Sequence, residues 1–403
     1  MLSRIRIQLV FTAFCAIVSL GSLGTDIGLA QSSVAQFQKA LRERATFDEN
    51  DFAALAQGQT VVKLLPVLDK REVAVCGLVS LQAPAEEFLR SFRENMTRKN
   101  NPAVLEIGSF SNPPAVDDLQ TLTIEKRDVE DLKECVVGNC QLKLSASMIE
   151  RFRKEVNWQA PDYPLQATQL LKLLLLDYVR DYRARGDAAL IEYNDKPKEV
   201  RLVEEQRALM AASGYVNDVL TDLPKYLEGF PTSELRIVEN AIVWSKIKFG
   251  LKPVTVINHI MIYRGEREAG PQFLIASKQI YANHYLYSSL ALTAFVNIPG
   301  ANRESYLVYE NRSRADGLEG AFSKIKRRIV ENRAVDGLKA ILEQSKMSLD
   351  ARALSLTESA PTSDREESWR RWTVGGIHLF LWLFLITAFV ALFALGTTTG
   401  KVA

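Results

Sequence analysis

Histidine and cysteine are both scarce in this chain, which has three histidines and four cysteines among 403 residues. The histidines are His259, His284 and His378, and no second histidine or cysteine stands near any of them at the spacing of a zinc site. The sequence also lacks a G-x-S-x-G turn, a Walker motif and a dinucleotide-binding fingerprint. We therefore predict no metal and no cofactor, and we regard an enzyme as the less favoured class of protein.

An excess of charge of one sign is missing as well. The chain carries 50 basic and 48 acidic residues, for a net charge of +2. A protein that binds nucleic acid through phosphate contacts needs a marked basic excess. We therefore predict no nucleic-acid partner, and the composition indicates no particular protein partner.

The C-terminal region combines a lack of charge with high apolarity. Residues 373–395 contain no Asp, Glu, Lys or Arg, and as a helix they would span about 34 Å, enough for a hydrocarbon core of about 30 Å. Trp369 and Trp372 stand where interfacial aromatic residues are expected. This pattern predicts a transmembrane helix over residues 372–396 with a short tail over 397–403, and a buried core helix is the alternative.

The N-terminal region reads as a secretory signal peptide. Arg4 and Arg6 precede an apolar run over residues 9–24, and small residues at Gly28 and Ala30 follow. We predict a signal peptide over residues 1–30 that is cleaved after Ala30, with an uncleaved anchor as the alternative. Either reading places the middle of the chain outside the cytoplasm. With the signal peptide removed, we predict a single-pass protein of the cell membrane, with its bulk on the periplasmic side.

The charges around the predicted span point the other way. Arg370 and Arg371 lie on the domain side of the span, whereas Lys401 is alone on the other side. Cytoplasmic flanks are usually the more basic ones. A tail-anchored protein that faces the cytoplasm therefore stays open as the alternative topology.

Two cysteines stand close together in the segment ECVVGNCQ. Cys135 and Cys140 are separated by a Gly138-Asn139 turn signal. In an oxidising compartment this spacing favours a short-loop disulfide, and a pair of free thiols is the alternative. Cys76 would then be an unpaired cysteine that packs as a small apolar residue.

The pattern of apolar residues predicts an α+β fold. A Val-rich strand ends before Pro84 and an amphipathic helix follows it, while residues 145–230 are mostly helical in pattern. After Lys252 we expect three antiparallel strands, the middle one long or bent, and then a long helix. We predict an antiparallel sheet with a long C-terminal helix, a helical middle insertion over about 145–230 and one C-terminal transmembrane helix. The domain would cover residues 31–346, with a flexible tether over 347–371.

This order of elements resembles the helix-grip fold of the START-like, or Bet v 1-like, superfamily. The resemblance is carried by VAVCGLVSLQAPAEEFLRSF and by the region from Val254 to Leu342. It implies a curved sheet that wraps the last helix and leaves an apolar cavity for a lipid or another hydrophobic ligand. The segments CVVGNCQLKL, ASKQIYANHY and YENRSRADGL are also similar to a group of uncharacterised exported bacterial proteins, a likeness that implies no activity.

Two segments supply candidate ligand-binding residues. In IYANHYLYSSL, a strand would place Tyr281, Tyr285 and Tyr287 on one face and His284 on the other. The tyrosines could line a cavity and offer hydroxyl groups to an amphiphile, or they could be ordinary sheet packing.

In YENRSRADG, two arginines stand at a junction between a strand and a helix. Arg312 and Arg314 could bind a phosphate or a carboxylate. The alternative is an internal salt bridge, with Ser313 or Asp316 as a helix cap.

Three functions fit these observations. The first is a membrane-anchored extracytoplasmic binding module that holds a lipid or another hydrophobic small molecule in a helix-grip cavity. The second is a structural or interaction protein of the envelope with a filled core, which acts on no substrate. The third and least favoured is a hydrolase that uses His259 or His284 with an unidentified nucleophile.

Overall fold

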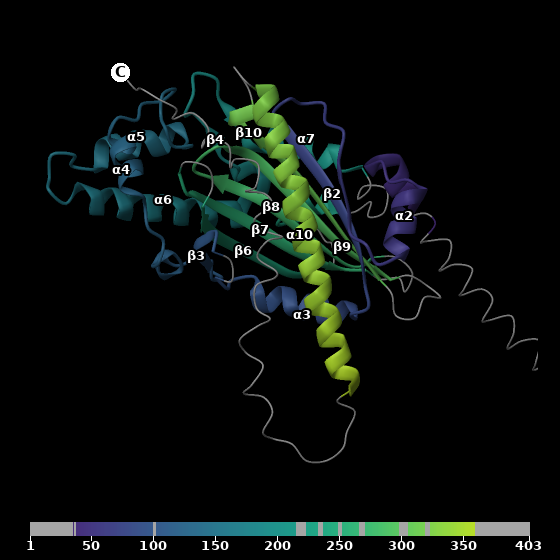
Figure 1. Cartoon of the computed structure of the whole chain (residues 1–403). Helices are drawn as coiled ribbons and strands as arrows, with labels where there is room; N and C mark the ends of the chain where they lie inside the picture. Colours follow the sequence, from purple (N-terminus) through teal and green to yellow (C-terminus); the bar gives the residue numbers. More distant parts are fainter. Residues whose placement is uncertain are drawn as a thin grey trace, which may run out of the picture.

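The structure is a computed structural model. It describes residue 35 and residues 38–99, 102–214, 223–232, 237–248, 252–265, 271–297, 305–318 and 323–358. These residues form an α+β structure around one large antiparallel sheet (Figure 1).

The sheet has eight strands in the order β1-β2-β10-β9-β8-β7-β6-β3, and all neighbours are antiparallel. The strands are β1 (Val61–Leu64), β2 (Glu72–Leu81), β3 (Val104–Ser109), β6 (Ile237–Ile247), β7 (Val254–Arg264), β8 (Pro271–Ala282), β9 (Leu286–Asn297) and β10 (Ser305–Ala315). A separate two-stranded sheet pairs β4 (Glu192–Tyr193) with β5 (Val200–Arg201).

Most long strands are covered on both faces. β2 and β10 are buried at every position. A strand that is covered on both sides carries apolar residues along its whole length, without the alternation of a half-exposed strand. This double coverage explains the nearly continuous apolar runs of the sequence.

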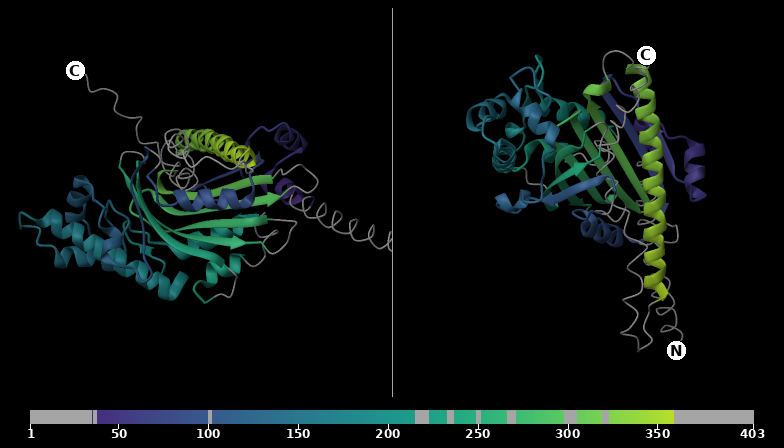
Figure 2. Two further views of the ribbon diagram at one scale, coloured as in Figure 1. Left: turned by 90° about the horizontal axis from the view of Figure 1, so that it is seen from below. Right: turned by 60° about the vertical axis from the view of Figure 1, so that its left-hand side comes forward.

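The two faces of the sheet have different coverings. We call the front face the side that carries Val75, Val256, Ile260, Ile275 and Phe295, and the back face the other side. Helices α3 (Ala85–Asn95) and α10 (Ser323–Glu358) contribute to the same apolar core as the front face. Figure 2 shows α10 extended along one side of the curved sheet.

A glycine brings α10 close to the sheet. A Cβ atom on Gly77 of β2 would lie 2.6 Å from Leu342 Cδ1 and 2.9 Å from Leu338 Cδ2. These distances are shorter than real Cβ contacts, so the helix packs against bare backbone at this point. The position of α10 across β2 is therefore set by close packing.

The back face is covered by the remaining helices. They are α2 (Glu49–Ala56), α4 (Lys126–Lys133), α5 (Ala146–Glu155), α6 (Tyr163–Arg185), α7 (Leu202–Ala212) and α9 (Leu223–Gly229), with short 3-10 turns η1 (Val116–Leu119) and η2 (Gly186–Ala189). A third 3-10 turn, η3 (Asp316–Leu318), contributes Leu318 to the front-face core. Helices α2, α7 and α9 share a core with β2, β9 and β10. Helices α4, α5 and α6 form a second core against β6, β7 and β8, which includes Trp244 and Tyr281.

The predicted fold class needs a correction at the C-terminus. Within the parts of the chain that the structure describes, no helix has both the length and the apolarity that a bilayer crossing requires. The transmembrane helix that we expected in the fold is therefore not supported. The predicted span (372–396), the tail and the predicted signal peptide (1–30) lie outside the described residues.

Two boundaries also differ from expectation. The middle one of the three strands expected after Lys252 is in fact two strands, β8 and β9, joined by a tight connection. Helix α10 continues to Glu358, past residue 347 where we expected a tether to begin.

Candidate functional site

The segment that carries the predicted tyrosines is a hairpin connection. Tyr281 lies near the end of β8, Tyr285 lies in the turn with a positive φ of 55°, and Tyr287 lies near the start of β9. The expectation that the three tyrosines share one face of a strand is therefore wrong. Tyr281 packs on the back face against Tyr178 and Tyr193, with ring centroids 6.4 and 6.5 Å apart.

Tyr287 is a centre of cation–π contacts. Its ring lies 4.1 Å from Lys143 Nζ, 5.5 Å from Lys196 Nζ and 5.4 Å from Arg71 Cζ. Lys196 Nζ also donates to the Tyr287 hydroxyl at 3.3 Å. Tyr287 thus holds charged side chains of the back face in place, and its ring is already occupied by them.

His284 is held at both ring nitrogens. Nε2 lies 2.9 Å from Asp128 Oδ2, and Nδ1 lies 3.2 Å from the carbonyl oxygen of Gln141. Burial opposes the ionised form of Asp128, but hydrogen bonds and charges from His284 and Lys252 outweigh it and lower the pKa of Asp128. Both ring nitrogens of His284 are therefore engaged by oxygen atoms of the chain.

His259 is held in the same complete way on the back face. The Tyr182 hydroxyl donates to Nδ1 at 2.9 Å, and Nε2 donates to Asn240 Oδ1 at 2.9 Å. Burial, with the positive charges of Lys278 and Arg183, lowers the pKa of His259 to about 3. In His259 and in His284, both ring nitrogens thus have hydrogen-bond partners within the chain.

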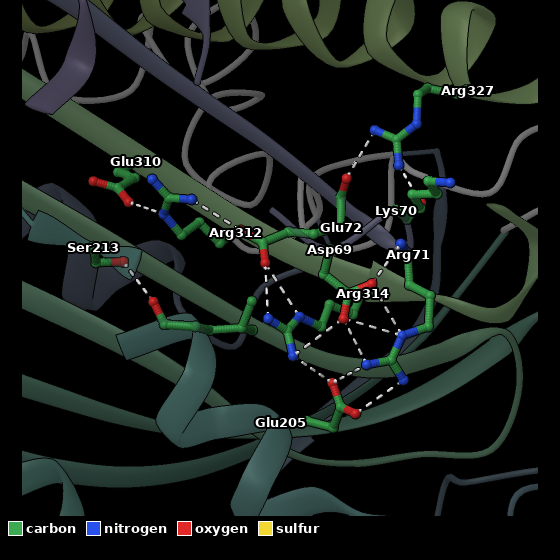
Figure 3. A network of polar contacts seen from close by, with 11 residues as sticks. Asp69, Lys70, Arg71, Glu72, Glu205, Ser213, Glu310, Arg312, Arg314 and Arg327 are labelled. Atoms are coloured by element: carbon green, nitrogen blue, oxygen red, sulfur yellow. Dashed lines mark hydrogen bonds and ion pairs between the residues drawn. The ribbon is translucent and has the colours of Figure 1, made fainter. Parts of the chain in front are cut away.

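The two predicted anion-binding arginines lie in a buried ion-pair network on the back face (Figure 3). Arg312 donates to Glu72 at 2.9 Å and to Glu310 at 2.6 Å. Arg314 donates to Glu72 at 3.1 Å and to Glu205 of α7 at 2.9 Å. The anions that these guanidinium groups bind are carboxylates of the chain itself, as the internal salt-bridge alternative expected.

The predicted helix caps have other roles. Ser313 lies inside β10, where its hydroxyl is 2.7 Å from that of Ser289. Asp316 pairs with Lys196 at 3.2 Å and with Lys143 at 3.3 Å. Neither residue adjoins the start of α10, which lies at Ser323.

A disulfide joins Cys135 and Cys140, with an S–S distance of 1.99 Å. The loop that it closes is fixed to neighbouring backbone, since Gly138 N donates to Asn194 O at 2.8 Å and Cys140 N donates to Asp195 O at 2.9 Å. Cys76 is a buried free cysteine, and burial raises the pKa of its thiol. Within the described residues, no group of three or more His, Cys, Asp or Glu side chains is arranged to hold a metal.

A set of polar residues on the front face was not identified from the sequence. On β7 and β8 the apolar front residues are interrupted by Asn258, Ser277 and Gln279, which are 3, 5 and 0% exposed. On β9 and β10 the interruption continues with Ser289, Asn311 and Ser313. We call these six residues the polar strip.

The two halves of the polar strip differ in hydrogen bonding. Ser289, Asn311 and Ser313 bind one another, with Asn311 Nδ2 donating to Ser289 Oγ at 3.3 Å and Ser313 Oγ donating to Asn311 Oδ1 at 2.9 Å. By contrast, Asn258 Oδ1, Ser277 Oγ and both amide atoms of Gln279 have no hydrogen-bond partner within the described chain.

This lack of partners is unusual because the residues are neighbours. Asn258 of β7 is directly paired with Gln279 of β8. Ser277 is paired with Ile260, which lies two residues after Asn258 along β7. An unpaired buried polar group costs about 1–3 kcal/mol, and folded proteins contain few of them. Four such atoms on adjacent strands therefore make this part of the front face the candidate site.

No protein-family model matches this chain, and no curated protein or solved structure matches it either. The resemblance to the START-like superfamily in the order of elements stays a prediction. A function has to be inferred from the geometry of the described residues.

Proposed function

We propose that this protein is a binding module that holds an amphiphilic small molecule, such as a lipid, against the front face of its sheet. The proposal is carried by the four unpaired polar atoms of Asn258, Ser277 and Gln279, which lie on a buried face that is otherwise apolar. A ligand with an apolar body and a polar group would cover the apolar residues and supply the missing hydrogen bonds.

The position of the helices supports this proposal. Helix α10 crosses β2 on the front side, and α3 packs on the same side, where Phe88 stacks on Phe295 with ring centroids 5.6 Å apart. A helix held across one face of a curved antiparallel sheet is the arrangement that a helix-grip binding protein requires. In this proposal the ligand contacts the polar strip, and Tyr281, Tyr287, Arg312 and Arg314 support the sheet from behind.

We propose further that the protein works in an oxidising compartment, such as the periplasm. The disulfide between Cys135 and Cys140 supports this location, because such bonds persist in oxidising surroundings and are rare in the cytosol.

Native mass spectrometry of the full chain tests the proposed function. The protein is purified under mild conditions, and its mass is compared before and after extraction with organic solvent. We expect a bound small molecule in the first sample and none in the second. The double variant Asn258→Leu, Gln279→Leu should carry much less of it, because it has lost three of the four unpaired atoms.

The chain offers a matched control for this experiment. Ser277 and Ser288 are both buried serines with an unpaired hydroxyl, but Ser288 is paired with Arg314 on the back face. Ser277→Ala should lower the bound fraction, whereas Ser288→Ala should leave it unchanged. A well-folded protein that carries no small molecule in any preparation would favour the structural-protein alternative and would refute the proposal.

A further inference from the structure

Among the described residues, the buried charges of the sheet all lie on one side of it. Lys246, Lys278, Glu310, Arg312 and Arg314 are less than a tenth exposed, and all five belong to the back face. Glu72 of β2 is buried on the same face. His259 also lies on the back, where its pKa of about 3 keeps it neutral at ordinary pH.

Among the described residues, the buried polar groups on the front face of these strands are neutral. The buried polar side chains that β7 to β10 place there are hydroxyl and carboxamide groups, as the polar strip exemplifies. They include an acceptor, Asn258 Oδ1, a donor and an acceptor on Gln279, and the hydroxyl of Ser277, which can do either. None of these groups can neutralise an ion.

The charged residues at the margin of the front face are already paired. Arg264 of β7 donates to Glu86 of α3 at 2.7 Å. Between α3 and α10, Glu87 faces Arg352 with a separation of 3.5 Å. Each margin charge named here thus has its counter-charge within the chain.

From this separation of charge we infer that the bound amphiphile has an uncharged polar group with both donor and acceptor atoms, as in a monoacylglycerol or a primary fatty amide. This inference rests on the proposed function and narrows it to one class of ligand. An ionised carboxylate or phosphate at the polar strip would lose its hydration without gaining a counter-ion, and that desolvation costs far more than burying a neutral group. A neutral polar group loses less hydration and can satisfy the amides of Asn258 and Gln279.

A matched series of ligands tests the inference on the full-length protein after removal of bound lipid. The monoglyceride, the primary amide and the carboxylate of dodecanoic acid share one apolar chain, and their dissociation constants are measured by calorimetry at neutral pH below their micelle-forming concentrations. We expect the Kd of the monoglyceride and of the amide to be at least about 100-fold lower than that of the carboxylate. The carboxylate should bind more tightly as the pH falls and its acid form accumulates.

The outcomes separate this inference from the proposed function. Equal affinity for all three ligands would refute the neutral-ligand inference and leave the binding module standing, whereas no binding of any of them, together with no co-purified molecule, would refute the binding module itself. In the double variant Asn258→Leu, Gln279→Leu, the preference for the neutral ligands should fall. An unchanged preference in a variant that still folds would show that the polar strip does not recognise the polar group, and the inference would then fail.

Discussion

The substitution Gln279→Leu should stabilise the ligand-free protein. Gln279 is 0% exposed, and neither its amide nitrogen nor its amide oxygen has a partner within the described residues. Each unpaired atom costs about 1–3 kcal/mol, and an apolar side chain of similar size removes that cost. Imperfect shape can take back up to about 1.5 kcal/mol, so we expect the free energy of unfolding to rise by about 0.5–6 kcal/mol.

A second buried glutamine provides the control. Gln206 of α7 is 3% exposed, and its Nε2 donates to the carbonyl oxygens of Gln279 and Ser289 at 2.6 and 3.1 Å. Gln206→Leu removes satisfied hydrogen bonds and should lower the free energy of unfolding by about 1–3 kcal/mol. The same chemical change should thus have opposite signs on the two faces.

Urea unfolding of the delipidated proteins measures both effects as shifts in the midpoint at constant slope. If Gln279→Leu destabilises the protein as much as Gln206→Leu does, the Gln279 amide is satisfied in the folded chain. The proposed ligand at the polar strip would then lose its main support. Added monoglyceride should stabilise the unsubstituted protein and have a smaller effect on Gln279→Leu.

Three further predictions follow from packing and charge. Gly186→Ala should destabilise the protein by about 3 kcal/mol or more, because φ is +56° and a Cβ would lie 1.7 Å from Phe230 O. The control Gly317→Ala should be nearly neutral in the same urea assay, because nothing lies within 4 Å of its Cβ position. Equal effects of the two substitutions would contradict this packing. His259 has a pKa of about 3 when folded, against an ordinary histidine pKa of 6.5, so the unfolded state binds more protons between these limits and stability should fall with decreasing pH by up to about 1.4 kcal/mol per unit. Urea unfolding at several pH values should show a weaker dependence in His259→Gln, and an identical dependence would refute the assignment. Arg312→Met leaves two buried carboxylates without this partner and should cost about 3–5 kcal/mol in thermal or urea unfolding, whereas a cost below about 1 kcal/mol would be that of a surface ion pair.

The sequence allowed the type of most elements to be predicted but misplaced one turn. The α+β pattern, the strand before Pro84 and the helix after it can be read from period and capping. The turn between β8 and β9 was missed because it contains neither Gly nor Pro, and a non-glycine residue, Tyr285, adopts the positive φ there. The apolar pattern therefore appeared to continue as one long strand.

The candidate site was harder to predict, because it depends on contacts that are distant in sequence. Arg312 meets Glu72 across 240 positions, so its partner could not be identified from local spacing. Asn258 and Gln279 look like ordinary polar positions within β-type runs. Their significance emerges only when the pairing of β7 with β8 puts them side by side on a buried face.

The close contact of α10 with β2 at Gly77 limits how the proposed ligand could reach the front face. Leu338 and Leu342 of α10 pack directly on the backbone of β2 at Gly77. Because close-packed interiors are hardly compressible, we expect β2 and α10 to move as one rigid unit. Space for an entering ligand would have to come from movement of the strands farther from β2 and α10. Any larger side chain at Gly77 would displace α10 from β2 and weaken the packing between them.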